Sequence, residues 1–284
     1  MKDYFCGWYF KCQSDTQTLA VIPAINKSND ERSCSIQLIT DTASQNILFP
    51  YSEFQKSGFN ISIDENKFSK NGFSLNINTP ELSVIGSVHF GSFSPIKYDI
   101  MGPFRYVPFM ECRHSIISMK HTVNGELTIN RVPYIFKNDV GYIEGDRGRS
   151  FPKEYAWTQC SFSDGSIMLS VADVPIYGYH FTGIIGIVLH NGKEYRIATY
   201  LGARAVKIHD GEIVIKQRNK CLTVKLPERS AHPLNAPTNG AMSRTIHENI
   251  ASRAYYRFEK NGKTVFEFEV DNAAFEYEYE SKKV

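Results

Sequence analysis

Three observations in the sequence predict an all-β protein with two β-barrel or β-sandwich domains and few short helices. Asn-Gly and Asp-Gly pairs recur along the chain, and such pairs accept the positive φ angles of tight hairpin turns. The stretches beside several of them alternate apolar and polar residues, as half-buried strands do. Helical periodicity is thin. The turn pairs are Asn71-Gly72, Asn124-Gly125, Asp164-Gly165, Asn191-Gly192, Asp210-Gly211 and Asn261-Gly262.

The carboxyl-terminal segment has the clearest strand pattern. Residues 265–270 read VFEFEV and residues 275–280 read FEYEYE, so apolar and acidic positions alternate in both. This pattern predicts a hairpin with one face on a core and one face in water, joined by a tight turn at residues 271–274. We therefore interpret its glutamates as a solvated face.

One segment, residues 243–254, also has helical features. Ile246, Ile250 and Ala254 recur every four residues, and Thr245 and Glu248 have capping-box spacing. A short helix and an irregular entry to a strand both fit this pattern.

The distribution of strand-like stretches predicts two domains. About eight such stretches after residue 160 suit an up-and-down barrel of the lipocalin type, which is wide enough for one small ligand. We expect an N-terminal β-sandwich or open barrel over residues 1–138 and a lipocalin-like barrel over residues 139–284. Residues 139–160 would join the two domains, and the Pro- and Asn-rich residues 227–239 predict a long loop that could cover a barrel mouth.

The composition excludes several function classes. The 284 residues are 42% hydrophobic and carry a net charge of +2, without a basic block. This balance argues against nucleic-acid binding and against docking to an anionic membrane. The amino terminus lacks the apolar stretch of a secretory signal, and the apolar run at 181–189 is too short to span a bilayer as a helix. We expect a soluble cytoplasmic protein without an integral membrane segment. The sequence leaves its oligomeric state open.

The cysteines do not indicate a metal centre. The six cysteines form no CxxC pair and no close-set framework, so reduced, buried thiols are expected. Cys112 and His114 form an isolated CxH pair without the second pair that a zinc site needs. We predict no metal site.

Residues 141–162, GYIEGDRGRSFPKEYAWTQCSF, are the most informative segment for function. They place two carboxylates, Glu144 and Asp146, beside Arg147 and Arg149. Few strand-rich segments need this mixture of charge, glycine and aromatic residues for folding alone. The aromatic side chains of the segment include Tyr142, Phe151, Tyr155 and Trp157.

This segment resembles the motif region of the tocopherol cyclase-like family. GWYFK at 7–11, GPF at 102–104 and GAMSR at 240–244 extend the resemblance over most of the chain. The family is similar to a broader group of double β-barrel proteins that includes carotenoid hydratases and pericyclase-type enzymes. The resemblance implies two lipocalin-like domains with an apolar pocket at or near their junction.

The resemblance also implies a reaction. The plant members of the family close a chroman ring by adding a phenol across a protonated prenyl double bond, and the related hydratases add water to a similar bond. A buried carboxylic acid can deliver such a proton, and aromatic faces can stabilise the cation that forms. By resemblance, Glu144 is the acid, and Tyr142, Phe151, Tyr155 and Trp157 line the site of a hydrophobic isoprenoid, quinone or lipid-like molecule. No cofactor is implied.

The motif departs from the family pattern at two positions. Asp146 falls where the broader group has Asn, and Arg147 falls where the family usually has Trp. A guanidinium near a carboxylate favours its ionised form, which is the opposite of what an acid needs. An ion-paired strand is therefore an equally good interpretation, with Glu144 and Asp146 on one face and Arg147 and Arg149 on the other. His121 is a candidate proton relay or ligand contact, although a hydrogen-bonded core histidine is the more common case.

Three functions remain open at this point. The first is a cofactor-free cyclase or hydratase with Glu144 and Asp146 as catalytic residues and Arg147 and His121 among the substrate contacts. The second is a non-catalytic, lipocalin-like carrier of a hydrophobic molecule. The third is an interaction protein with a filled interior, which would show an exposed apolar patch.

Overall fold

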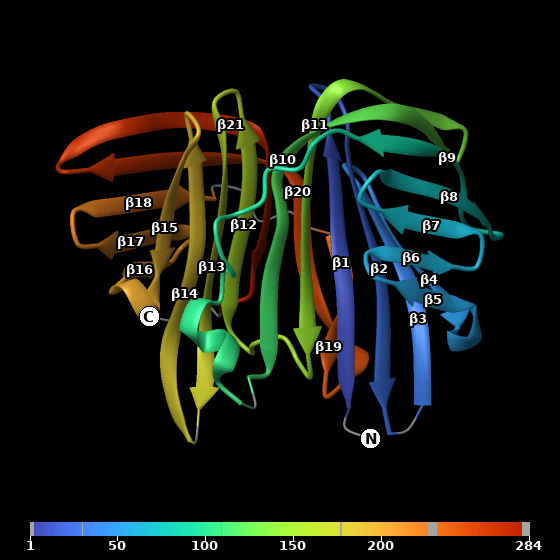
Figure 1. The fold of residues 1–284 in the computed structure, drawn as a ribbon, viewed down its shortest axis with the longest axis horizontal. Coiled ribbons are helices and arrows are strands. Elements are labelled where there is room, and N and C mark those ends of the chain that lie inside the picture. Colours follow the sequence, from blue (N-terminus) through green and yellow to red (C-terminus); the bar gives the residue numbers. More distant parts are fainter. Residues whose placement is uncertain (1–2, 30, 109, 177, 227–231, 280–284) are drawn as a thin grey trace. The chain divides into compact units, whose positions relative to one another are not determined.

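A computed structural model describes residues 3–29, 31–108, 110–176, 178–226 and 232–279. Within these ranges the chain forms two antiparallel sheets, which confirms the all-β prediction (Figure 1). The expected short helices are three 3-10 helices in the described residues: η1 (Tyr51–Glu53), η2 (Gly102–Tyr106) and η3 (Thr199–Leu201). None of the described helices is long and apolar enough to cross a bilayer.

The first sheet is an antiparallel meander in which β1, the first strand of the chain, lies in the middle and pairs with β2 and β11. Its strand order is β4-β3-β2-β1-β11-β10-β9-β8-β7-β6-β5. The two edge strands, β4 and β5, are consecutive in the chain and are joined by η1 alone, so the sheet has the connectivity of a barrel rolled towards closure. Its strands are β1 (Tyr4–Gln13), β2 (Thr18–Ser28), β3 (Glu31–Thr40), β4 (Ser44–Pro50), β5 (Phe54–Ser57), β6 (Asn60–Ile63), β7 (Asn66–Ser69), β8 (Gly72–Asn78), β9 (Ser83–Phe90), β10 (Cys112–Ile129) and β11 (Val132–Gly148).

The second sheet repeats this topology with different residues. Its order is β15-β14-β13-β12-β21-β20-β18-β17-β16, with β19 paired to β20. Its edges, β15 and β16, are again consecutive and joined by a 3-10 helix, η3. The strands are β12 (Tyr155–Phe162), β13 (Gly165–Ile176), β14 (Tyr179–His190), β15 (Lys193–Ala198), β16 (Arg204–His209), β17 (Glu212–Gln217), β18 (Lys220–Lys225), β19 (His232–Thr238), β20 (Ala241–Lys260) and β21 (Lys263–Tyr277).

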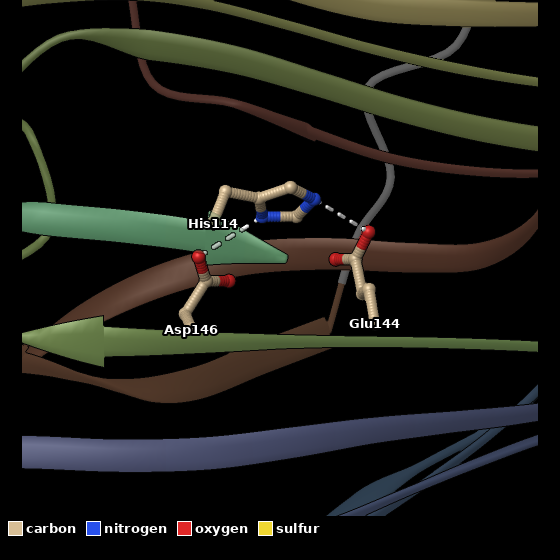
Figure 2. A group of neighbouring side chains, drawn as sticks. All are labelled: His114, Glu144 and Asp146. Atoms are coloured by element: carbon tan, nitrogen blue, oxygen red, sulfur yellow. Dashed lines mark hydrogen bonds and ion pairs between the residues drawn. The ribbon is translucent and has the colours of Figure 1, made fainter. Parts of the chain in front are cut away.

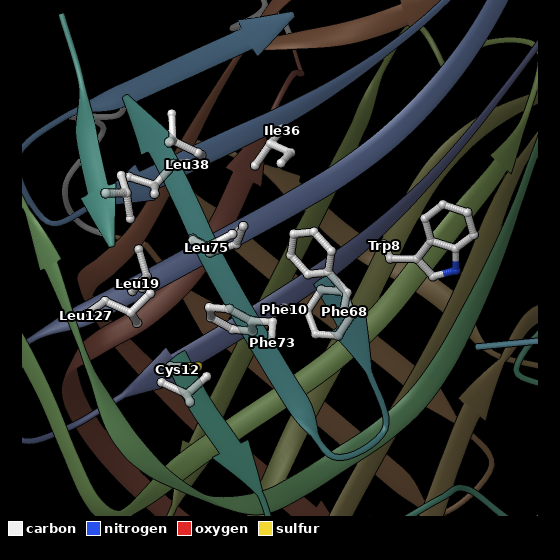
Figure 3. Close-up of a cluster of buried hydrophobic side chains, with 14 of the residues drawn as sticks. Trp8, Phe10, Cys12, Leu19, Ile36, Leu38, Phe68, Phe73, Leu75 and Leu127 are labelled. Carbon is white, nitrogen blue, oxygen red and sulfur yellow. The ribbon is translucent and has the colours of Figure 1, made fainter. Parts of the chain in front are cut away.

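Apolar side chains occupy the inner face of each sheet. In the first sheet the rings of Phe10 and Phe68 lie 5.4 Å apart, and those of Phe68 and Phe73 lie 5.8 Å apart (Figure 3). Leucine and isoleucine side chains from facing strands surround them. The second sheet has a separate core built around Tyr256 and Phe258. Burial of these two cores supplies the main driving force for folding.

β11 is the last strand of the first sheet along the chain, and the parity of its core-facing residues changes part-way along it. Tyr134 and Phe136 pack into the core at even positions, whereas Ile143 packs there at an odd position. Side chains alternate along a strand, so one extra residue must lie between them. Asn138 has φ of 57° within β11 and marks this bulge. After the bulge, the even positions of β11 face outward.

Three of the predicted two-residue turns are confirmed, and the one predicted at Asn124-Gly125 is wrong. Both residues of Asn191-Gly192, Asp210-Gly211 and Asn261-Gly262 have positive φ and join paired strands, as type I′ turns do. Asn124-Gly125 is not a turn, because β10 continues to Ile129 and the chain reverses at Asn130-Arg131. Gly125 is needed for space instead, since a Cβ there would lie 2.3 Å from the carbonyl oxygen of Ser87.

Three further sequence expectations are corrected. The carboxyl-terminal hairpin is one strand, β21, which pairs with β20 and has a register shift near residues 271–272. Residues 243–254 lie in β20, so the strand alternative holds and the helix does not. The expected loop at 227–239 contains β19 at His232–Thr238, and residues 227–231 lie outside the described ranges.

The chain divides into two compact units that do not follow the sheets strand by strand. The first unit comprises Met1–Ile96, His114–Ser150 and Leu234–Arg244, and the second comprises Lys97–Arg113, Phe151–Pro233 and Thr245–Val284. β11 extends across residue 138, where the sequence suggested a boundary, and ends at Gly148.

A buried arginine fixes the segment between β9 and β10 within the second unit. The side chain of Arg196 is 5% exposed and forms an ion pair with Glu194 at 3.1 Å. Its guanidinium also donates to the carbonyl oxygens of Tyr98 and Asp99 at 2.7 and 3.0 Å. The GPF motif lies in this segment, in η2, where Gly102 packs against the ring of Tyr200.

Candidate functional site

Three side chains from β10 and β11 of the first unit form the candidate site. The imidazole of His114 lies between two carboxylates, with Nδ1 2.9 Å from Asp146 Oδ1 and Nε2 3.1 Å from Glu144 Oε2 (Figure 2). The side chains of His114 and Glu144 are 8% and 6% exposed, whereas that of Asp146 is 22% exposed. The group therefore extends from a buried carboxylate to one that solvent reaches.

Tyr142 extends this group on the same face of β11. Its hydroxyl donates a hydrogen bond to Glu144 Oε2 at 2.5 Å, and its side chain is buried. Tyr9 and Lys11 of β1 lie directly across the strand pair from Glu144 and Tyr142, and both are buried. At β1 and β11, the outer face of the first sheet thus carries buried polar groups, while the inner face is mainly apolar.

The two carboxylates control the charge of His114. Burial alone would lower the pKa of His114, but the nearby charges of Glu144 and Asp146 and their hydrogen bonds raise that pKa well above its usual value. These contacts favour the doubly protonated imidazole, in which Nδ1–H donates to Asp146 and Nε2 lies 3.1 Å from Glu144 Oε2. Burial and the charge of Glu144 likewise raise the pKa of Tyr142 well above its usual value, so its hydroxyl keeps its proton.

The bulge at Asn138 is what places these carboxylates on the outer face. Counting by twos from Phe136 would direct Tyr142 and Glu144 into the apolar core, where an ionised carboxylate is very costly. The extra residue instead turns them to the face that His114 shares. Bulges of this kind commonly redirect side chains beside functional sites.

His114, Glu144 and Asp146 also form a set of possible metal ligands. Their donor atoms all lie within 4.8 Å of one another. However, each carboxylate contacts a different nitrogen of the ring, and a single ion can use only one of those nitrogens. The geometry therefore fits a hydrogen-bonded bridge better than a shared coordination point.

The structure places His121 away from this group, on the inner face of the first sheet. Its ring lies 4.6 Å from the ring of Phe90 and 4.9 Å from that of Phe93. The hydroxyl of Ser118 donates to the carbonyl oxygen of Lys120, so His121 Nδ1 must donate to that hydroxyl at 3.0 Å. Burial lowers the pKa of His121 to about 4, and this histidine is neutral.

Arg147, which the sequence places near the two carboxylates, lies on the other face of β11. Arg147 is exposed and follows Glu144 by three positions, on the opposite face of β11. The expected division of faces thus describes β11 correctly, with Arg147 on one side and the two carboxylates on the other. His114, from the neighbouring strand, contacts both carboxylates.

The remaining predicted site residues belong to the second unit. Phe151 precedes β12, and its ring lies 6.0 Å from the ring of Tyr155. The hydroxyl of Tyr155 donates to Glu276, and Trp157 is buried opposite Glu276 in the strand register. Glu276 therefore makes a partly buried polar contact and does not belong to a freely solvated face.

Sequence reasoning named His114 in an incomplete metal pair and did not place it beside Glu144. The sequence does not show which residues of β11 face the core after Asn138. The bulge there brings the even-numbered residues of β10 and β11 to the same face. An Asn between apolar positions of opposite parity, Tyr134 and Phe136 before it and Ile143 after it, is the sequence signal that could have revealed the bulge.

Fold and site together define an antiparallel two-sheet β protein with a buried histidine–carboxylate group on the outer face of its first sheet. No known protein-family model matches the sequence, and no curated protein matches it. Solved structures share the fold at very low sequence identity.

Three of these structures cover almost the whole chain. CghA with Sch210972 is similar with a TM-score of 0.63 at 9% identity, over 96% of this chain and 87% of CghA. A candidate AttH from Nitrosomonas europaea has a TM-score of 0.54 at 8% identity, over 99% and 93% of the two chains. Kievitone hydratase from Nectria haematococca has a TM-score of 0.54 at 9% identity, over 97% and 89%. At these identities the similarity establishes the fold.

Proposed function

We propose that this protein is a cofactor-free cyclase or hydratase, similar to the tocopherol cyclase-like proteins, that protonates a double bond of an apolar substrate. The observation that carries the proposal is the buried Glu144 carboxylate with His114 and Tyr142 directed at one of its oxygens. A pre-arranged proton donor in a buried setting is what alkene protonation requires. The name of kievitone hydratase, which shares the fold, agrees with this class of reaction.

The proposed step balances without a redox partner. The acid proton forms a C–H bond with the π electron pair of the alkene and leaves a cation on the other carbon. A phenol oxygen of the substrate, or water, then forms a C–O bond to that cation and returns its proton to the carboxylate. The substrate would be an isoprenoid, a quinone or a related lipid-like molecule, and we expect a cytoplasmic protein.

The carrier alternative has less support. A lipocalin-like carrier holds its ligand inside the barrel, but the rings of Phe10, Phe68 and Phe73 occupy the interior of the first sheet. Tyr256 and Phe258 lie in the core of the second sheet. A carrier also has no need for a histidine held between two carboxylates.

The test is turnover of prenylated phenols and linear polyenes, together with any small molecule that co-purifies, followed by mass spectrometry. Glu144→Gln keeps the shape of the side chain and removes its ability to transfer a proton. We expect turnover to fall by about 100-fold or more while ligand binding persists. Glu267→Gln, an exposed position on β21, is the matched control and should keep full activity. Full activity of Glu144→Gln would refute the acid role.

A further inference from the structure

In the resting site, the proton that a glutamic acid catalyst must deliver lies on a different residue. The carboxylate of Glu144 lies against a histidine that is charged at rest, so the transferable proton of the pair resides on the ring. An acid must nevertheless present that proton to the substrate at the moment of reaction.

We propose that His114 stores the proton that Glu144 delivers and that Asp146 keeps His114 loaded and oriented. This inference rests on the proposed function and assigns roles to a residue that the motif does not contain. His114 acts through Glu144 and is a positioning and proton-storing residue. Glu144 is the group that reaches the substrate.

The geometry separates the two ring nitrogens by role. Nδ1–H is held by Asp146 Oδ1 at 2.9 Å in a hydrogen bond. Nε2 lies 3.1 Å from Glu144 Oε2, is buried, and makes no well-directed hydrogen bond. The Nε2 proton is thus the one with a short path to Glu144, and its weaker alignment leaves it the easier of the two to transfer.

Burial supplies the trigger for the transfer. An ion pair loses stability relative to the neutral pair when water is removed from around it. Glu144 and His114 retain only 6% and 8% exposure, and an apolar substrate that excluded the remaining water would favour movement of the proton from Nε2 to Oε2, which yields a neutral imidazole and a carboxylic acid. Asp146, the more exposed carboxylate, keeps its hydrogen bond to Nδ1–H. After C–O bond formation the released proton returns by the same path.

Other ionisable groups also surround the His114–Glu144 pair. Tyr142 already donates to Glu144 and holds its proton tightly. Tyr9 and Lys11 face the pair from β1, where they are the register partners of Glu144 and Tyr142. On β10 and β11, Arg113 donates to the carbonyl oxygen of Val107, and Arg147 lies on the opposite strand face.

The charge state can be measured without any substrate, by side-chain 15N NMR of the full-length protein. At about pH 7.5, where an ordinary histidine is mostly neutral, His114 should show two protonated ring nitrogens. His121 should show one protonated nitrogen, Nδ1, and serves as the internal reference. Asp146→Asn should lower the titration midpoint of His114 by about one pH unit or more, and Glu144→Gln should lower it similarly. A neutral His114 in the wild type, or a midpoint unmoved by Asp146→Asn, would overturn the proposal.

Turnover separates this inference from the proposed function. His114→Gln should reduce turnover by about 100-fold, and His114→Ala should regain part of it when imidazole is added. Normal turnover in both His114 variants, with Glu144→Gln inactive, would overturn proton storage and leave the acid role of Glu144 standing. Normal turnover in Glu144→Gln would overturn the proposed function itself, whatever the charge of His114.

Discussion

The closing strands of the two sheets, β11 and β21, have the same topological position but carry different chemistry. Each pairs with the first strand of its sheet, and each changes its core-facing parity part-way along. Beyond that point β11 presents Glu144 beside a histidine of its neighbour β10. β21 presents Glu276, and its neighbour β20 places Glu248 directly opposite. In the first sheet a histidine lies beside the glutamate, whereas in the second sheet two glutamates are register partners.

This difference shows that the neighbouring strand, more than the glutamate itself, decides what the site can do. Both glutamates accept a hydrogen bond from a tyrosine, Tyr142 in one sheet and Tyr155 in the other. In the first sheet the imidazole of His114 lies beside such a pair, whereas in the second sheet the register partner of the glutamate is Glu248. Like charges directly opposite each other on paired strands instead destabilise a sheet.

The largest effect should come from removing the bulge that makes β11 different. Deletion of Asn138 shifts the later residues by one position, which turns Glu144 inward and Ile143 outward. Burying a carboxylate in an apolar core while exposing an isoleucine should cost about 5 kcal/mol or more of the free energy of unfolding. Urea denaturation followed by circular dichroism measures it. Asn138→Gly, which accepts the positive φ, is the control and should change stability by about 1 kcal/mol or less. A deletion variant as stable as the wild type would refute the bulge.

The polar groups inside the two sheets should respond differently to acid. The pKa of His121 is lowered to about 4 in the folded state, so between pH 6.5 and 4 only the unfolded chain gains this proton. The free energy of unfolding should fall by about 3 kcal/mol over that window and then level off. His121→Phe should remove this part of the acid sensitivity in denaturation curves. An unchanged pH profile in that variant would show that His121 is not buried as a neutral base.

Gly141 of β11 should be sensitive to any added side chain because of the same histidine. A Cβ at this position would lie 2.3 Å from His121 Nε2 and 2.7 Å from a methyl carbon of Val123. Gly141→Ala should therefore lose about 1–3 kcal/mol of stability by overpacking. In a His121→Ala background the same substitution should cost much less. Equal costs in the two backgrounds would mean that the ring does not occupy this space.

The smallest effect should come from the corresponding polar group in the second core. Tyr256 is fully buried, and its hydroxyl lies 2.6 Å from Thr158 Oγ1, which also donates to the carbonyl oxygen of Ala274. Tyr256→Phe removes one partner of a satisfied pair and should cost about 1 kcal/mol, independently of pH between 4 and 8. A pH-dependent loss would contradict the contrast with His121.

Strand content and several turns followed from the sequence because they depend on neighbouring residues. Asn191-Gly192 and Asp210-Gly211 form hairpin turns through their own conformational preferences. β21 was misjudged as two strands, since its apolar series shifts from Phe266 and Phe268 to Ala273 and Phe275, which resembles a turn when only the sequence is read. The strand pairing restores continuity there.

The acidic part of the site was visible in the sequence, and its basic part was not. Glu144 and Asp146 share a strand face by simple alternation. His114 joins them from a position thirty residues earlier than Glu144, and only the bulge at Asn138 sets the parity that brings them together. That contact depends on the register of two long strands, which local sequence patterns do not specify.

The most direct test of the central claim is mass spectrometry of product formed in deuterium oxide. If Glu144 protonates a double bond with an exchangeable proton from His114, each product molecule should carry one non-exchangeable deuterium at the former alkene carbon. The Glu144→Gln protein should form almost no labelled product. Product without carbon-bound deuterium would instead indicate a rearrangement that uses only the hydrogens of the substrate, and would contradict acid catalysis by this group.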